Sequence, residues 1–84
     1  MYKLIFRPQA EKDLKKLPFN VRLQIIKKLK YFLSVANPLD FASHLKDTDL
    51  GSYRFRIGDY RVIFDVEDKT IIILTLGNRR DIYK

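Results

Sequence analysis

The sequence contains no cysteine and no tryptophan, and it has one histidine, one methionine, three glycines and three prolines. Without cysteine the chain can form neither a disulfide framework nor a thiolate metal site, and a single histidine, His44, argues against structural zinc. The chain also lacks an apolar run of the length of a signal peptide or of the ~20 residues that span a membrane. We therefore expect a cytoplasmic protein that has no membrane partner and uses no metal or other cofactor.

Acidic residues are also scarce, because 10 Asp and Glu stand against 17 Lys and Arg, for a net charge of +7. This charge balance fits a nucleic-acid partner or an acidic protein partner, and it also fits a basic surface that only keeps the protein in solution. At 84 residues the chain is expected to be a single domain, 1–84, with a small core built from few elements.

The first half of the chain predicts one strand and two helices. Apolar residues alternate over 2–7, which indicates a strand that Pro8 ends. Helical spacing over 8–17, with proline at each end, predicts a short helix. A longer helix is expected to begin at Asn20 as its N-cap and to end at Asn37. Its apolar stripe consists of Val21, Ile25, Ile26, Leu29, Phe32 and Leu33. This stripe is expected to pack on a sheet, and its exposed edge is an alternative candidate for a partner-binding groove.

The second half predicts a sheet. Residues 39–52 have no sustained period and indicate a long connection, with one short extended piece around Leu45. Residues 53–57 and 60–66 alternate in hydrophobicity about Gly58 and Asp59, which predicts a hairpin with a type II′ turn.

Residues 70–76 are apolar on both parities, which is typical of a central strand covered on both faces. The element order is then β-α-α-β-β-β. We expect an α+β fold, an antiparallel sheet with two helices packed on one face.

The hairpin concentrates arginine on one face. If Ile57 pairs with Tyr60 across the turn, Arg56 lies opposite Arg61, and Arg54 shares their face, which should look away from the helices toward solvent. Like charges opposite one another destabilise a sheet by up to about 1 kcal/mol, and a bound anion would remove that conflict. The alternative is an ordinary basic sheet face, neutralised by neighbouring carboxylates.

A second basic cluster follows the last strand, where Arg79 and Arg80 precede Tyr83. The planar guanidinium of arginine suits phosphate, and an aromatic ring can stack on an unpaired base. Four arginines and an aromatic ring near one sheet face therefore suit single-stranded RNA.

Three segments together resemble the RelE toxins of the RelE/ParE superfamily. These are the hairpin 51–64 (GSYRFRIGDYRVIF), the ending 77–83 (GNRRDIY) and the opening 14–18 (LKKLP). The resemblance covers essentially the whole chain, and it is more specific for the superfamily than for a branch within it.

The resemblance implies a toxin of a type II toxin–antitoxin pair that enters the ribosomal A site and cuts messenger RNA there. The ribose 2′-hydroxyl attacks the adjacent phosphate and gives a 2′,3′-cyclic phosphate without metal. By motif position, Arg61 stabilises charge on the phosphate, Arg79 stabilises or protonates the leaving 5′-oxygen, and Tyr83 stacks on a base. The implied partners are a cognate antitoxin, the ribosome and mRNA.

The same resemblance places Arg56 among the catalytic residues and Arg54 and Arg80 among the RNA-binding ones. Arg54 and Arg56 stand where well-studied members have lysines, and arginine, with a pKa above about 12, does not give up its proton. Position 78 is Asn where many relatives have His. The general base is therefore left open, with His44 as one candidate.

Two other functions stay open at this point. ParE-type members share the fold but inhibit DNA gyrase by binding, without cutting RNA. A member that has lost activity and only binds antitoxin is the third alternative. Retention of Arg61, Arg79 and Tyr83 favours the nuclease.

Overall fold

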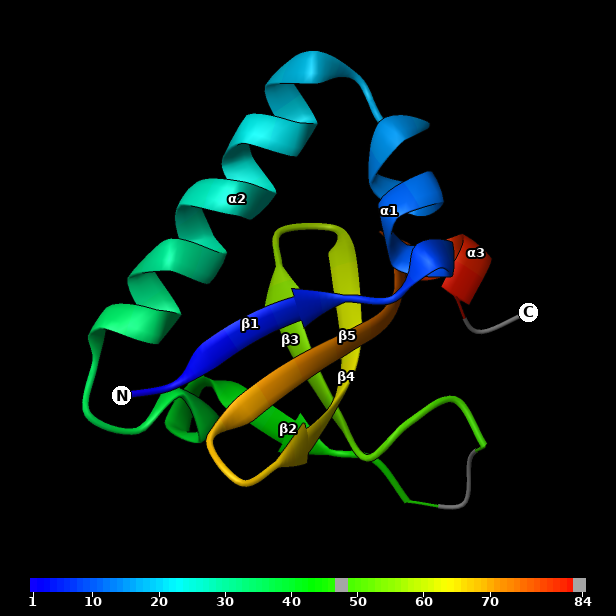
Figure 1. The fold of residues 1–84 in the computed structure, drawn as a ribbon. Helices are drawn as coiled ribbons and strands as arrows, with labels where there is room; N and C mark the ends of the chain where they lie inside the picture. The colour runs from blue at the N-terminus through cyan, green and yellow to red at the C-terminus, as the bar shows by residue number, and fades with distance from the viewer. Residues whose placement is uncertain (47–48, 83–84) are drawn as a thin grey trace.

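The computed structural model describes residues 1–46 and 49–82. The elements of this part of the chain are, in order, β1 (Lys3–Phe6), α1 (Pro8–Lys15), α2 (Phe19–Ser34), the 3₁₀ helix η1 (Pro38–Phe41), β2 (Ala42–His44), β3 (Tyr53–Ile57), β4 (Tyr60–Glu67), β5 (Thr70–Asn78) and α3 (Arg79–Ile82) (Figure 1). The expected α+β class is confirmed.

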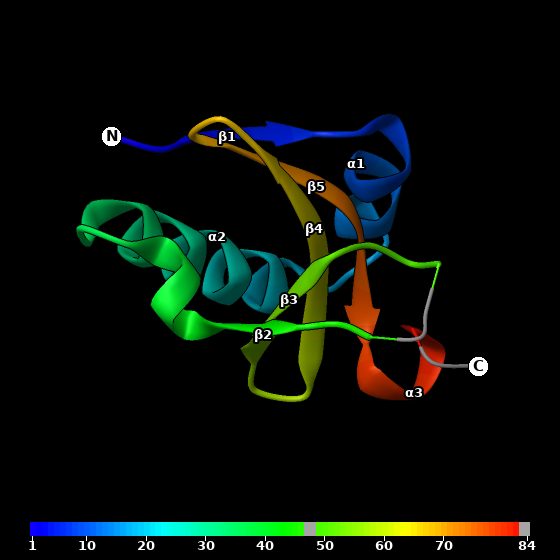
Figure 2. The same ribbon diagram turned by 90° about the horizontal axis from the view of Figure 1, so that it is seen from below.

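The sheet is mixed, with the strand order β1-β5-β4-β3-β2. Strands β2 to β5 form an antiparallel meander, as expected. Strand β1 differs from the expectation of a fully antiparallel sheet, because it pairs with β5 in parallel, with Leu4 opposite Ile71. Alternating hydrophobicity identifies a strand but not its neighbour, so the direction of this pairing was not encoded in the pattern. Figure 2 shows β1 at one edge of the twisted sheet and β2 toward the other.

Helix α1 begins with Pro8 in its first turn, as expected, and ends at Lys15. Helix α2 begins one residue before Asn20, so the prediction of Asn20 as N-cap is wrong. Pro18 takes that position with φ −55° and ψ 150°, and its carbonyl accepts from the amide of Arg22 at 3.0 Å. Proline fixes the φ angle needed there, so the chain enters the helix without a capping side chain.

The connection after α2 has more structure than its sequence indicated. The side-chain oxygen of Asn37 caps η1 by accepting from the amide of Leu39 at 3.2 Å. The short extended piece expected around Leu45 is β2, which pairs with β3 through Ala42 and Phe55. Because β2 is only three residues long, it has no period that could reveal it.

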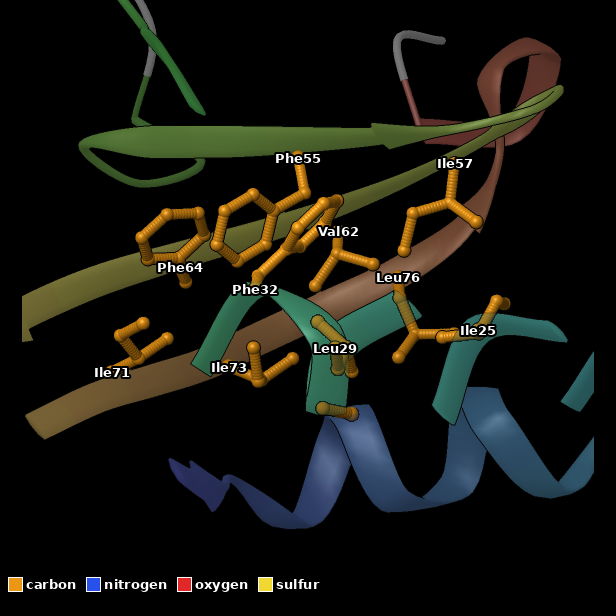
Figure 3. Close-up of a cluster of buried hydrophobic side chains, with 11 residues drawn as sticks. Ile25, Leu29, Phe32, Phe55, Ile57, Val62, Phe64, Ile71, Ile73 and Leu76 are labelled. Atoms are coloured by element: carbon orange, nitrogen blue, oxygen red, sulfur yellow. The ribbon is translucent and has the colours of Figure 1, made fainter. Parts of the chain in front are cut away.

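The core lies between helices α1 and α2 and one face of the sheet. The predicted stripe of α2 supplies its buried side chains Ile25, Leu29 and Phe32 (Figure 3). The Phe55 ring lies 4.6 Å from the Phe32 ring and 4.3 Å from the Phe64 ring, measured between centroids. Burying a side chain of this size stabilises the fold by about 1.5–3 kcal/mol.

The second face of the sheet, called the open face below, is partly covered by the loop before β3. A Cβ on Gly51 would stand 2.7 Å from Cγ2 of Ile63 and 2.9 Å from Cδ1 of Leu74, so only glycine allows this approach. Ile63 is fully buried and Leu74 is half-buried beneath the loop. Strand β5 lies between β1 and β4. One face of β5 is covered by the helices and the other partly by this loop, which explains its apolar residues on both parities.

Candidate functional site

The β3–β4 hairpin has the predicted register. Ile57 pairs with Tyr60, Arg56 with Arg61 and Arg54 with Ile63. Gly58 has a φ of 60°, and Asp59 is not among the residues with a positive φ. A type II′ turn has this combination, with a positive φ at the first of its two central residues only. The three hairpin arginines therefore share the open face of the sheet.

The open face does not expose these arginines equally, contrary to the expectation that all of them look toward solvent. Arg61 is only 6 % exposed, and it is the one polar or charged residue that is buried in the described part of the chain. Arg56, directly opposite, is exposed, and Arg54 is half-buried. Burying a guanidinium is costly unless its N–H groups are bonded, so the surroundings of Arg61 must supply acceptors.

The acceptors are carbonyls of the turn itself. Nη1 of Arg61 donates to the carbonyl oxygens of Gly58 and Tyr60, each at 2.9 Å. These two bonds give the buried guanidinium acceptors within the hairpin and fix its orientation relative to the turn.

The C-terminal cluster lies beside the same turn. The amide of Arg79 donates to the carbonyl of Asp59 at 2.9 Å. Arg79 and Arg80 are exposed on α3, which packs on the ends of β4 and β5. The structure thus brings Arg56, Arg61 and Arg79 to one end of the sheet, and Arg80 follows Arg79 on α3. Tyr83 lies outside the described residues.

Asn78, which stands where many RelE toxins have His, has a structural role. Its side-chain oxygen accepts from the amide of Arg80 at 3.0 Å and so caps the first turn of α3. His44 lies on the edge strand β2 opposite Tyr53, at the end of β3 away from the turn. The structure therefore places His44 at the opposite end of β3 from Arg56, near Arg54 and not near the turn.

A groove that the sequence did not predict lies beside the C-terminal cluster. Its volume is about 440 Å³, and Lys16 and Leu17 after α1, Tyr60 of β4 and Ile82 of α3 are among its lining residues. Its α1 wall is held by Asp13, whose Oδ2 accepts from the hydroxyl of Thr75 at 2.6 Å and from the amide of Leu76 at 3.3 Å.

Strand β1 pairs with β5 only as far as Ile73, so the amide of Leu76 has no partner on β1, and the carboxylate of Asp13 accepts its hydrogen bond instead. The position of Asp13 in the charged stretch of α1 gave no sign of this partner.

The chemistry available here is that of fixed positive charge. Among residues 1–46 and 49–82, no three His, Cys, Asp or Glu side chains lie together in a way that could hold a metal ion. The helices of these residues also include none with the length and hydrophobicity of a membrane span. Guanidinium groups at one end of a sheet can bind phosphate and stabilise charge that develops on it.

Residues 4–83 match the family model described as the ParE toxin of the type II toxin–antitoxin system parDE. The chain belongs to the RelE/ParE superfamily of type II toxins. Toxin RelG of Mycobacterium tuberculosis is 31 % identical over 85 residues, which cover 99 % of this chain and 97 % of RelG.

Solved toxin–antitoxin complexes contain the same fold. The RelBE2 complex of Mycobacterium tuberculosis matches with a TM-score of 0.81 and 29 % identity, over 93 % of this toxin and 98 % of that chain. The archaeal RelE–RelB complex of Pyrococcus horikoshii matches with a TM-score of 0.72 and 32 % identity, over 95 % and 97 % of the two chains. Among type II toxins, this one is therefore similar to RelE proteins.

Proposed function

We propose that this toxin is a ribosome-dependent endoribonuclease that enters the ribosomal A site, cuts messenger RNA and so inhibits translation in the cytoplasm. The observation that carries the proposal is the convergence of Arg56, Arg61 and Arg79 at one end of the sheet, around the turn of the β3–β4 hairpin. The similarity to RelE proteins supports the same function.

The proposed reaction needs charge stabilisation more than any other contribution. The 2′-hydroxyl attacks the adjacent phosphorus, the bond to the 5′-oxygen breaks, and the product is a 2′,3′-cyclic phosphate. Arg61 and Arg56 stabilise the charge that grows on the phosphate, and Arg79 stabilises the leaving 5′-oxygen, which takes a proton from water and becomes a 5′-hydroxyl. Tyr83 stacks on a base, and Arg54 and Arg80 hold the RNA backbone. The proton of the 2′-hydroxyl goes to a base outside these arginines, because a guanidinium does not accept one.

Cleavage of a defined message on programmed ribosomes, mapped by primer extension, tests this function. Arg79→Ala should lower the single-turnover rate by about 10²–10³-fold, as expected when a group that stabilises developing charge is removed. Arg7→Ala is the matched control, because Arg7 is exposed at the N-terminal end of α1, whereas the groove lies at the C-terminal end of this helix, and its loss should leave the rate within about twofold.

A zinc-selective chelator at constant magnesium should have no effect on cleavage, because the proposed chemistry uses no metal. An active Arg79→Ala variant, or activity that zinc alone restores, would contradict the proposal.

Inhibition of DNA gyrase is the second candidate function, because the family model that the chain matches is described as ParE. It predicts loss of gyrase supercoiling activity on addition of the toxin and intact message on programmed ribosomes. The nuclease proposal predicts the opposite result in both assays.

We also propose a cognate antitoxin as partner, bound along the outer side of α2. Phe19, Leu23, Tyr31 and Phe41 are 66 %, 45 %, 52 % and 42 % exposed. Lysines flank them, and Lys27 and Lys28 line a hollow of about 350 Å³ with Tyr31. An acidic amphipathic helix would cover the apolar side chains and pair with the lysines. The solved relatives are complexes with antitoxins of their own.

Co-expression with the neighbouring gene product should yield a complex with nanomolar or tighter affinity. Leu23→Asp should weaken it by 10-fold or more, because it places a carboxylate against the apolar and acidic face of the partner. Glu11→Asp, on the exposed side of α1, is the control that should leave the affinity unchanged. Recovery of the toxin alone at micromolar concentrations would count against this partner.

A further inference from the structure

The turn between β3 and β4 uses three successive carbonyl groups to hold two different arginines. The carbonyls of Gly58 and Tyr60 accept from Nη1 of Arg61, each at 2.9 Å, and the carbonyl between them, that of Asp59, accepts from the amide of Arg79 at 2.9 Å. A single stretch of backbone therefore fixes the side chain of one arginine and the main chain of the other.

This arrangement depends on the conformation of one residue. Gly58 has a φ of 60°, a value that costs glycine nothing and costs residues with a Cβ substantially more. A Cβ at this position would also stand 3.4 Å from Nε2 of Gln24 on α2. A change of backbone conformation at Gly58 would turn its own carbonyl and those that follow, and with them the acceptors of both arginines.

The two bonds to Arg61 matter because its surroundings are closed. At 6 % exposure the guanidinium has few water molecules to replace a lost acceptor, so its direction is set by the protein. Arg79 is exposed, and it is restrained by the main-chain bond to Asp59 at the start of α3.

We infer that the turn Gly58–Asp59–Tyr60 is the positioning element of the proposed site and that it fixes Arg61 and Arg79 relative to one another. This inference rests on the proposed cleavage reaction and deepens it. The turn does not touch the scissile phosphate, and it acts through the two arginines. Such positioning is worth much in rate, because a displacement of about 1 Å can cost ~10²-fold.

The geometry is tested first without RNA, by amide hydrogen exchange of the full chain followed by NMR. The Arg79 amide should be protected in the wild type, and Gly58→Ala should reduce its protection 10-fold or more. The Leu76 amide is the internal control, because its acceptor is Asp13 on α1 and its protection should not change. Equal protection of Arg79 in wild type and Gly58→Ala would overturn the inference whatever the toxin does to RNA.

The second arm measures single-turnover cleavage on programmed ribosomes. Gly58→Ala should lower the maximal rate 10-fold or more and change the half-saturating ribosome concentration less than about threefold. In an Arg79→Ala background the same substitution should lower the rate by a smaller factor than in the wild type, because one of the two groups that it misplaces is absent. Full multiplication of the two losses would mean independent structural damage and would overturn the inference.

Two further variants separate positioning from loss of stability. Asp68→Ala places alanine at the other turn position with a positive φ, 49°, and so tests alanine in this backbone conformation at a distance from the site. It should keep the wild-type rate. Gly58→Asn should recover part of the rate lost in Gly58→Ala, because asparagine tolerates positive φ better than alanine.

A rate loss in Asp68→Ala equal to that in Gly58→Ala would again overturn positioning. If the wild type cuts no RNA, the proposed function fails, and hydrogen exchange still decides whether the turn holds Arg79.

Discussion

The two faces of the β3–β4 hairpin are built from alternate residues of the same strands, and they are stabilised in different ways. On the helix face Phe55, Val62 and Phe64 are 0–1 % exposed among other apolar side chains. On the open face Arg61 is almost as deeply buried, and two particular carbonyls accept hydrogen bonds from it. Apolar burial requires only volume and shape, whereas a buried charge requires acceptors at defined positions. The largest effects on stability are therefore expected on the helix face, and the largest effects on function are expected at the arginines of the open face.

The largest effect is expected on the helix face. Phe64→Ala removes a fully buried ring that stacks on Phe55 and should lower the free energy of unfolding by about 3–5 kcal/mol. Phe19→Ala, at an exposed position, should change it by less than about 0.5 kcal/mol. Urea unfolding of both variants measures the difference. Equal effects would mean that the ring of Phe64 is not part of the core.

Arg61 combines features of both faces, because it lies among the proposed functional residues of the open face and is nevertheless buried. Arg61→Ala should lower the cleavage rate by about 10²–10³-fold. It should also reduce stability by about 1–3 kcal/mol, since it leaves the carbonyls of Gly58 and Tyr60 without their donor.

Arg56→Ala, directly opposite and exposed, should not destabilise the fold. Thermal melting beside single-turnover cleavage distinguishes the two arginines. Unchanged melting in Arg61→Ala would show that its bonds to the turn contribute nothing to stability.

The cover of the open face by the loop before β3 can be disturbed at Gly51. Gly51→Ala places a Cβ within 3 Å of Ile63 and Leu74 and should destabilise the protein by about 1–3 kcal/mol, because Ile63 is fully buried and cannot move aside. Gly77→Ala is the matched control. Its Cβ would meet Ile82 at an ordinary 3.5 Å, so its effect should stay below about 1 kcal/mol. Urea unfolding measures the loss of free energy of unfolding in both variants, and a larger loss in Gly51→Ala shows that the loop packs tightly on Ile63 and Leu74.

The smallest effect is expected at Arg54, which lies on the open face two residues farther from the turn than Arg56. If it only anchors RNA backbone, Arg54→Ala should weaken binding of single-stranded RNA and reduce its salt dependence by about one ion, with little change in the maximal cleavage rate. A rate loss as large as that of Arg61→Ala would place Arg54 at the scissile phosphate. Titration at several salt concentrations makes this measurement.

Elements with strong periods or defined turn residues could be predicted from the sequence alone. Alternation on both sides of Gly58-Asp59 gave the hairpin, its turn and its register, and so placed Arg54, Arg56 and Arg61 on one face. The helical stripe containing Ile25, Leu29 and Phe32 gave the core face of α2. These features are local, since a period or a two-residue turn is complete within one segment.

Features that join distant segments of the chain depend on tertiary contacts and could not be predicted from local patterns. The tertiary structure set the parallel pairing of β1 with β5, the contact of Asp13 with Thr75, and the bond between Arg79 and Asp59. It also decided that Arg61 is buried and Arg56 exposed, although the two are identical in type and directly opposite in register. The reason is that burial and hydrogen-bond partners depend on loops, helices and turns that are distant in the sequence. The spacing of residues along one strand contains no information about which of these segments will pack on it.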